Sequence, residues 1–320
     1  MGEFELIRRH FMRAKPGPAV VLGIGDDCAL LRPSPGHQLA ISSDMLVEGR
    51  HFFPEVDPAA LGHKALAVNL SDLAAMGARP LGFTLALALP RADDAWLADF
   101  SGGLLALADA HGCPLVGGDT TRGPLNLCIT VFGEVAPGQA LRRDAARTGD
   151  DLWLSGRTGE ARLALERLRG TGWALASTED HALCRQRLER PTPRLALGRK
   201  LAGVAHAAID LSDGLAGDLG HILSASGVGA EIDLVALPVA PDLQPLPETA
   251  RLECLLHGGD DYELLFTAPP AAHDAVLRAG TASATPVQRI GRITAAEGLR
   301  LLGPDGRARP VNARSYDHFA

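Results

Sequence analysis

Strand-like and helix-like segments alternate along the whole chain, and this alternation narrows the possible folds more than any other feature. Apolar runs of strand length occur at 82–89, 125–135 and 152–155. Apolar residues at helical spacing fill much of the sequence between such runs, and Asp57 with Pro58 marks the start of a long alanine-rich helix. The interleaving of the two element types predicts an α/β or α+β fold.

The stretch 136–151 divides the chain into two parts. It contains one proline, two glycines and charges of both signs, a composition typical of a linker. A chain of 320 residues is long enough for two domains, and the 46% of residues that are apolar can supply two cores. We therefore expect an N-terminal α/β domain over 1–138 and a C-terminal α/β domain over 139–320.

Charge and hydropathy exclude several classes of partner. The net charge is -7 and no Lys/Arg tract is present, so the chain lacks the basic surface of a nucleic-acid binder. No apolar run approaches the about 18 residues that cross a bilayer, and acidic residues near the N-terminus occupy positions that are basic in a signal peptide. The five cysteines form no CxxC pair, as is typical of reduced thiols. We expect a cytoplasmic protein without nucleic-acid or membrane partners.

Aspartates follow apolar runs at several places, and one lies within a helix. Carboxylates at strand ends lie where open α/β sheets build ligand sites. Several carboxylates without His or Cys partners form a set of hard oxygen ligands that suits magnesium. The aspartates concerned are Asp26 and Asp27 after 20–24, Asp44 after a strand at 39–42, Asp119 after 114–116, Asp210 and Asp213 after 207–209, and Asp72 within the helix that begins at Pro58.

Each motif also has a structural interpretation. Asp26 or Asp27 could be a turn residue, Ser42 to Asp44 could cap a helix, and Asp213 could cap the helix that follows it. The two Gly-Gly-Asp sequences, 117–119 and 258–260, could be turns or could let backbone N–H groups approach phosphate. Asp72 is harder to explain in this way, because an unpaired carboxylate in a weakly charged helix is costly to bury.

Several nucleotide-binding motifs are missing from the sequence. It contains no GxxxxGK[ST], so it is not a P-loop enzyme, and it has no H-R-D or D-F-G set of a protein kinase. Gly23-Ile24-Gly25 is followed by two acids that would repel a pyrophosphate, which excludes a dinucleotide fingerprint. Phosphates must therefore be held through metal ions and backbone groups.

Taken together and in order, these motifs resemble the thiamine-monophosphate kinase family of the aminoimidazole ribonucleotide synthetase-like superfamily. The resemblance implies a two-domain fold in which the N-terminal domain forms a homodimer and nucleotide lies between the domains. It also implies phosphorylation of thiamine monophosphate by ATP to give thiamine diphosphate. The segments that carry it span nearly the whole chain: 23–29, 42–44, 64–78, 117–121, 210–214 and 316–319.

The resemblance assigns roles to single residues. Magnesium would be surrounded by Asp27, Ser42, Ser43, Asp44, Asp72, Asp119, Asp210 and Asp213. ATP would contact Gly118, Asp119, Arg143 and Ser212, and the thiamine substrate would contact His51, Asp260 and Tyr316. The sequence departs from the family at one of these positions: the usual Gly-Gly-Glu-Asp is Gly-Gly-Asp-Asp here, which shortens the side chain at Asp260 by one methylene.

The expected chemistry agrees with the residues present. A phosphate acceptor is already ionised at neutral pH, so we expect no general base and a direct in-line transfer assisted by several magnesium ions. Other ATP-using members of the superfamily remain alternatives, although the hydrogenase-maturation member would need a reactive C-terminal cysteine and the last cysteine here is Cys254. A non-catalytic metal- or nucleotide-binding module is the alternative from a different class.

Overall fold

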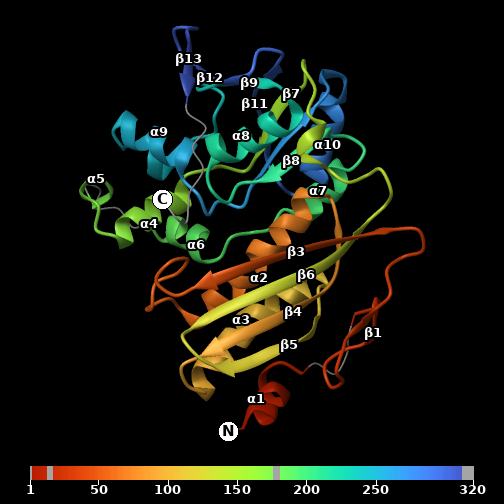
Figure 1. The fold of residues 1–320 in the computed structure, drawn as a ribbon. Helices are drawn as coiled ribbons and strands as arrows, with labels where there is room; N and C mark the ends of the chain where they lie inside the picture. Colours follow the sequence, from red (N-terminus) through yellow and green to blue (C-terminus); the bar gives the residue numbers. More distant parts are fainter. Residues whose placement is uncertain (1, 13–16, 176–180, 312–320) are drawn as a thin grey trace. The chain divides into compact units, whose positions relative to one another are not determined.

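The computed structural model describes residues 2–12, 17–175 and 181–311. The chain forms two compact units, each with its own β-sheet (Figure 1). The N-terminal unit comprises residues 1–73 and 78–138, and the C-terminal unit comprises 74–77 and 139–320. Helices and sheets are mixed in both units, which confirms the predicted fold class.

The N-terminal unit is built around a four-stranded sheet. Its elements are α1 (Glu3–His10), β1 (Val20–Leu22), β2 (Leu30–Leu31), β3 (Gln38–Val47), α2 (Pro58–Ala75), β4 (Arg79–Leu89), α3 (Asp94–His111), β5 (Leu115–Arg122) and β6 (Asn126–Val135). The sheet has the order β3-β6-β4-β5, and β4 and β5 are its parallel pair. Helices α2 and α3 lie against one face of this sheet (Figure 1). β1 and β2 form a separate two-stranded sheet.

The two long helices begin and end where the sequence predicts. The Asp57 carboxylate accepts a hydrogen bond from the Ala60 N–H at 2.7 Å, and Asp93 accepts one from the Trp96 N–H at 3.2 Å. These side chains satisfy N–H groups that a helix start leaves without an intrahelical partner. Gly77 follows α2 with a φ of 68°, a conformation that favours glycine. The predicted helices starting near Pro58 and Asp93 are therefore confirmed.

Strands β3 and β5 are longer than predicted, and this corrects the placement of two motifs. Ser42 to Asp44 and Gly117 to Asp119 lie inside strands, whereas we expected them after strand ends. β3 pairs with β6 at ten successive positions. Backbone hydrogen bonds between the two strands therefore stabilise β3 even in its middle, where the side chains are polar. The apolar run marks only the buried start of β5, and in β3 it marks a part in which Leu39 and Ile41 are exposed.

The C-terminal unit contains the larger sheet. Its elements are η1 (Arg143–Ala145), β7 (Asp151–Ser155), α4 (Glu160–Leu168), α5 (Gly172–Leu175), α6 (Ala182–Glu189), α7 (Leu195–Leu201), β8 (Ala207–Asp210), α8 (Leu215–Ser226), β9 (Gly229–Asp233), η2 (Pro241–Leu243), α9 (Glu248–His257), β10 (Leu264–Ala268), η3 (Pro270–Ala272), α10 (His273–Ala282), β11 (Val287–Thr294), β12 (Gly298–Leu302) and β13 (Ala308–Val311). The strand order is β13-β12-β9-β11-β7-β10-β8, with β12 parallel to β9.

Two differences from the predicted elements matter for the site. The sequence predicts a helix from Ser212 to Ala225, but α8 begins three residues later, at Leu215, because Ser212 to Gly214 form a loop in which Gly214 has a φ of 116°. α9 and β11 were not predicted at all, since their apolar residues are interrupted by charges. The sequence also predicts a hairpin that turns at residues 304–306, and β12 and β13 confirm it.

Both units bury apolar cores dominated by leucine, alanine and valine, and all five cysteines are free thiols. In the part of the chain that the structure describes, no helix combines the length and the apolar character needed to span a bilayer.

Candidate active site

Four polar residues meet where β3 faces α2. The Ser42 hydroxyl donates a hydrogen bond to the Asp72 carboxylate at 2.5 Å. The backbone N–H of Asp44 donates to the Asn69 side-chain oxygen at 3.0 Å. Asn69 and Asp72 are three residues apart on α2, so both side chains face the strand. The structure therefore brings together three of the predicted magnesium ligands and adds Asn69.

Ser43 and Asp119 lie on the other face of the same sheet. Neighbouring residues of a strand point to opposite faces, so Ser43 points away from α2. Asp119 pairs with Ala86 of β4, Ala86 with Cys128 of β6, and Cys128 with Met45 of β3, which puts Asp119 on the face of Ser43. The Ser43 hydroxyl contacts the Thr130 hydroxyl at 3.0 Å. Within the N-terminal unit, the predicted magnesium ligands are therefore divided between two faces.

The outer face, the one away from α2, carries a cleft of about 1140 Å³. Asp26, Asp27, Gly118 and Asp119 line it together with apolar side chains of α1 and β3. Asp26 accepts a hydrogen bond from the Asp27 N–H at 2.8 Å, which holds the loop before β2. Asp27 therefore lines the same cleft as Gly118 and Asp119, the predicted nucleotide contacts on β5.

Gly118 is required by the close approach of β5 to β4. Its φ is 145°, and a Cβ atom at this position would lie 1.9 Å from the Leu85 carbonyl oxygen. A residue with a side chain cannot be accommodated there without moving backbone. Gly118 also lines the cleft and is exposed, so its backbone can contact a ligand there.

His51 is held by the strand that precedes it. The backbone N–H of Val47 donates to Nδ1 of His51 at 3.0 Å. Because an N–H group can only donate, Nδ1 is the acceptor, and a neutral ring must carry its proton on Nε2. In that tautomer Nε2 is the donor atom of the ring.

In the C-terminal unit, the loop after β8 carries three predicted residues. Asp210 is the last residue of β8 and is buried, whereas Ser212 and Asp213 are half-buried. The Asp218 carboxylate accepts hydrogen bonds from the N–H groups of Asp213 and Gly214, both at 3.1 Å. Asp218 therefore fixes the loop at the start of α8, a role that sequence reasoning missed.

Burial, together with the charge of Asp213, raises the pKa of Asp218 to about 7. Hydrogen bonds from the Asp213 and Gly214 N–H groups and the charge of Arg143 oppose this rise. The electrostatic influence of Arg143 on Asp218 indicates that this predicted ATP contact lies near the loop. The carbonyl oxygen of Arg143 also accepts a hydrogen bond from Ser226 of α8 at 2.8 Å.

Asp260 lies beside Ser212. The N–H of Asp260 donates to the Ser212 carbonyl oxygen at 2.9 Å, and the N–H of Tyr262 donates to the Leu211 carbonyl oxygen at 2.8 Å. Asp260 and Tyr262 both have positive φ, 65° and 50°. Such conformations cost free energy outside glycine and cluster at functional sites. Tyr316, the remaining predicted substrate contact, lies outside the described residues.

Hard oxygen donors dominate the predicted metal residues. The group of Ser42, Asp44 and Asp72 offers a hydroxyl and carboxylates, and Asp210 with Asp213 offers carboxylates. No imidazole or thiol belongs to these two groups of described residues. This donor set fits magnesium and does not favour a thiophilic metal. Asn69 could have been found from its three-residue spacing to Asp72, whereas no local sequence signal distinguishes Asp218 from a surface acid.

The chain matches two families over most of its length. Residues 25–135 match the AIR synthase related protein, N-terminal domain, and residues 147–303 match the AIR synthase related protein, C-terminal domain. The thiamine-monophosphate kinase of Salmonella typhimurium is 46% identical over 322 residues, which cover 100% of this chain and 98% of that protein.

Solved structures of similar proteins have the same fold. The thiamine-monophosphate kinase of Stenotrophomonas maltophilia K279a superposes with a TM-score of 0.84 at 48% identity, covering 91% of this chain and 93% of that one. AaThiL complexed with AMPPCP and TMP superposes with a TM-score of 0.77 at 29% identity, covering 90% and 89%. The likeness extends through both units and includes the segments that carry the aspartates, and the chain is therefore a member of the thiamine-monophosphate kinase family of enzymes.

Proposed function

We propose that this protein transfers the terminal phosphoryl group of ATP to thiamine monophosphate, giving thiamine diphosphate and ADP. The observation that carries the proposal is the full-length likeness to thiamine-monophosphate kinases at 46% identity. The relative AaThiL, complexed with AMPPCP and TMP, further supports a nucleotide and a thiamine phosphate as the two substrates.

Magnesium would be held by the aspartates of both units. In the N-terminal unit Asp44 and Asp72 would be ligands, and the hydroxyl of Ser42 would orient Asp72 through its 2.5 Å hydrogen bond. The outer-face residues Ser43, Asp27 and Asp119 complete the proposed set in that unit, and Asp210 with Asp213 would serve in the C-terminal unit. Bound magnesium would neutralise charge on the phosphates of both substrates.

The remaining predicted residues would bind and orient the substrates. Gly118 would offer its backbone to the nucleotide phosphates, while Arg143 and Ser212 would contact ATP from the C-terminal unit. Nε2 of His51, which carries the proton in the neutral ring, would donate to the thiamine substrate. Asp260 would contact the same substrate from a backbone conformation that points to function.

The reaction would be direct and would need no general base. The acceptor oxygen of a phosphate monoester is largely ionised at neutral pH, so no proton has to be removed before attack. The main barrier is bringing two anions together, which positioning and charge neutralisation can lower. Incubation with radiolabelled ATP followed by acid quenching tests this step, because a phosphorylated protein would contradict direct transfer.

Purified protein incubated with ATP and magnesium, with thiamine monophosphate, free thiamine or no acceptor, tests the overall reaction. We expect thiamine diphosphate only from the monophosphate, with one ADP formed for each diphosphate. ATP binding without formation of thiamine diphosphate would show that thiamine monophosphate is not the acceptor. Another ATP-using reaction of the superfamily would then be the alternative.

We further propose that the protein works as a cytoplasmic homodimer. Five free thiols suit a reducing compartment. Exposed apolar side chains on the outer face of β3, namely Leu39, Ile41 and Met45, support self-association through the N-terminal unit.

A further inference from the structure

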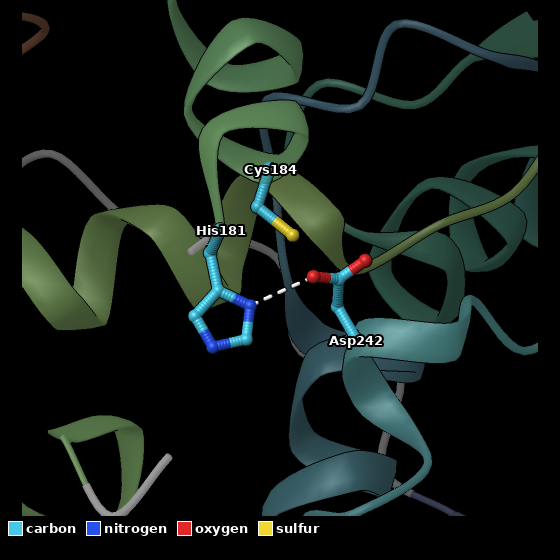
Figure 2. A group of neighbouring side chains, drawn as sticks. All are labelled: His181, Cys184 and Asp242. Carbon is cyan, nitrogen blue, oxygen red and sulfur yellow. Dashed lines mark hydrogen bonds and ion pairs between the residues drawn. The ribbon is translucent and has the colours of Figure 1, made fainter. Parts of the chain in front are cut away.

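A histidine, a cysteine and an aspartate converge at the start of α6, and none of them belongs to the predicted magnesium ligands. His181 directly precedes this helix, Cys184 lies one turn into it, and Asp242 belongs to η2. One ligand atom from each of the three lies within 4.8 Å of the others. Figure 2 shows the Cys184 sulfur and a ring nitrogen of His181 both directed toward the Asp242 carboxylate.

The cluster is buried. The His181 side chain is 4% exposed and Cys184 is fully covered, while the Asp242 side chain keeps 17% of its surface. Nδ1 of His181 and Oδ1 of Asp242 are 2.7 Å apart. The partial exposure of Asp242 gives solvent one route of access to the group.

The hydrogen bonds of the cluster leave one buried atom unsatisfied. Nε2 of His181 has no hydrogen-bond partner among the described residues, although the atom is covered. Figure 2 shows that this nitrogen points away from Cys184 and Asp242, so the atom that His181 offers to the cluster is Nδ1.

The cluster does not have the properties of a nucleophilic site. Burial, followed by the negative charges of Asp242 and Glu160, raises the pKa of the Cys184 thiol to about 12. The thiol is therefore protonated at neutral pH, whereas reactive cysteines have a lowered pKa and access to substrate. Both His181 and Cys184 are directed toward the carboxylate, so the imidazole is not arranged as a base for the sulfur.

The donor set does match a metal ion of the zinc class. Zinc binds thiolate sulfur, imidazole nitrogen and carboxylate oxygen, and it accepts three protein ligands with water in the fourth position. One thiolate and one carboxylate would neutralise the two positive charges of the ion, which reduces the cost of placing it in a buried pocket. Tetrahedral binding would require the 2.7 Å separation of nitrogen and oxygen to open by roughly 0.6 Å, a shift within the reach of side-chain rotation.

We propose that His181, Cys184 and Asp242 bind one zinc-class divalent cation, at a site distinct from the aspartates assigned to magnesium. Binding breaks the S–H bond of Cys184, forms a metal–sulfur bond and releases the proton to solvent. The ion would join the start of α6 to η2, and the fourth ligand would be water reaching the site past Asp242. Because a proton is released, affinity for the ion would increase as the pH rises.

Cobalt(II) titration tests the site in the full-length protein, with magnesium in excess to occupy the aspartates. Cobalt bound to a thiolate gives a charge-transfer absorption in the near ultraviolet that oxygen ligands do not give. We expect this absorption to saturate at one cobalt per chain and to disappear when zinc is added. A wild-type protein without the absorption would overturn the proposal, and that result does not depend on any variant folding.

Substitutions identify the ligands. Cys184→Ala should abolish the thiolate absorption, and Asp242→Asn should weaken cobalt binding by more than about tenfold. Cys113→Ala is the matched control, because Cys113 is also fully buried and its thiol pKa is also raised to about 12, but it lies in the N-terminal unit. Absorption that persists in Cys184→Ala, or that is lost in Cys113→Ala, would contradict the assignment.

Discussion

Two acidic residues of the N-terminal unit, Glu134 and Asp72, differ in their hydrogen-bond partners and therefore in the roles that suit them. Glu134 on β6 is buried, and it accepts hydrogen bonds from the backbone and side chain of Ser34 and from Arg79. A carboxylate with a cationic partner and several donors stabilises the fold. Asp72 is half-buried on α2, accepts a hydrogen bond from the hydroxyl of Ser42 and lies beside Asn69, which also faces β3. That environment suits a carboxylate that holds a metal ion.

The change Asp72→Asn should lower kcat by at least about 10² while the protein stays folded, because it removes one charge of the proposed magnesium site. Steady-state kinetics with saturating ATP and magnesium measure the loss, and thermal unfolding checks the fold. Asp109→Asn, at an exposed position of α3, removes the same charge and should leave kcat unchanged. Near-normal turnover of the Asp72 variant would remove this residue from the magnesium site.

Glu134 should make the stability of the protein depend on pH. Burial alone would raise the pKa of Glu134, but the hydrogen bonds from Ser34 and the charge of Arg79 outweigh burial and lower it below its usual 4.5. A lowered pKa means that the folded state binds the proton more weakly than the unfolded state does. The stabilisation is therefore fully present above about pH 4.5 and is lost as the pH falls through the folded-state pKa.

Urea unfolding of Glu134→Gln at several pH values measures this contribution. The variant should be less stable than the wild type by about 1–3 kcal/mol at neutral pH, and the difference should shrink in acid. Asp144→Asn serves as the control, since Asp144 pairs with Arg142 in an exposed position where ion pairs contribute little. A difference between Glu134→Gln and wild type that stays constant with pH would contradict the proposed linkage.

Among the elements, α2 and α3 approach each other through glycines. A Cβ atom on Gly103 would lie 1.9 Å from the carbonyl oxygen of Ala59, and one on Gly62 would lie 2.1 Å from that of Phe100. Both contacts are with backbone, so a side chain at either position must push the helices apart. Since α2 carries Asn69 and Asp72 toward β3, the separation of these helices bears on the geometry of the candidate site.

Gly103→Ala should therefore destabilise the protein by roughly 3 kcal/mol, as overpacking of a close contact does. Gly102→Ala is a matched control one residue away, because a Cβ atom at Gly102 meets nothing within 4 Å. That control should be neutral or stabilising by up to about 1 kcal/mol, owing to the higher helix propensity of alanine. Chemical denaturation compares the two variants, and equal stabilities would show that the helices do not depend on this contact.

Element type could be predicted from the sequence more reliably than element length. The spacing of apolar residues and the capping residues indicate α2 and α3. The first N–H groups of these helices donate to Asp57 and Asp93, which are close in sequence and determine where the helices begin. The extent of β3 depends on its pairing with β6, which lies about ninety residues away along the chain. The residues of β3 alone do not indicate that pairing. The same limit explains why Ser42 to Asp44 were expected after a strand and lie within one.

The candidate site was predictable as a set of residues and unpredictable as an arrangement. Motifs identified Ser42, Asp72 and Asp119, but only the strand register shows that Asp119 faces away from the other two. Asn69 and Asp218 act through hydrogen bonds to Asp44 and to the Asp213 loop, and such contacts appear only once the chain is folded.

At the scale of the whole molecule, the outer face of β3 presents an apolar surface that composition does not reveal. Leu39, Ile41 and Met45 alternate along the strand and are 53%, 60% and 55% exposed. Side chains an even number of residues apart on a strand share one face, so these three lie together on the outer face, with Ser43 between Ile41 and Met45. An apolar surface of this kind on the N-terminal unit is the physical basis for the proposed homodimer.

Ile41→Asp should convert the dimer into a monomer without unfolding the chain, because the side chain is exposed in a single chain and a carboxylate is costly to bury in an apolar interface. Light scattering measures the change: the wild type should have twice the chain mass of 33.5 kDa, and the variant should have the mass of one chain at the same concentration. Val235→Asp, at a 70% exposed position of the C-terminal unit, should leave the dimer intact. A monomeric wild type, or a dimeric Ile41→Asp, would exclude this face as the interface. Because Ile41 itself lines the cleft that contains Asp27 and Asp119, we expect this variant to lose affinity for nucleotide as well.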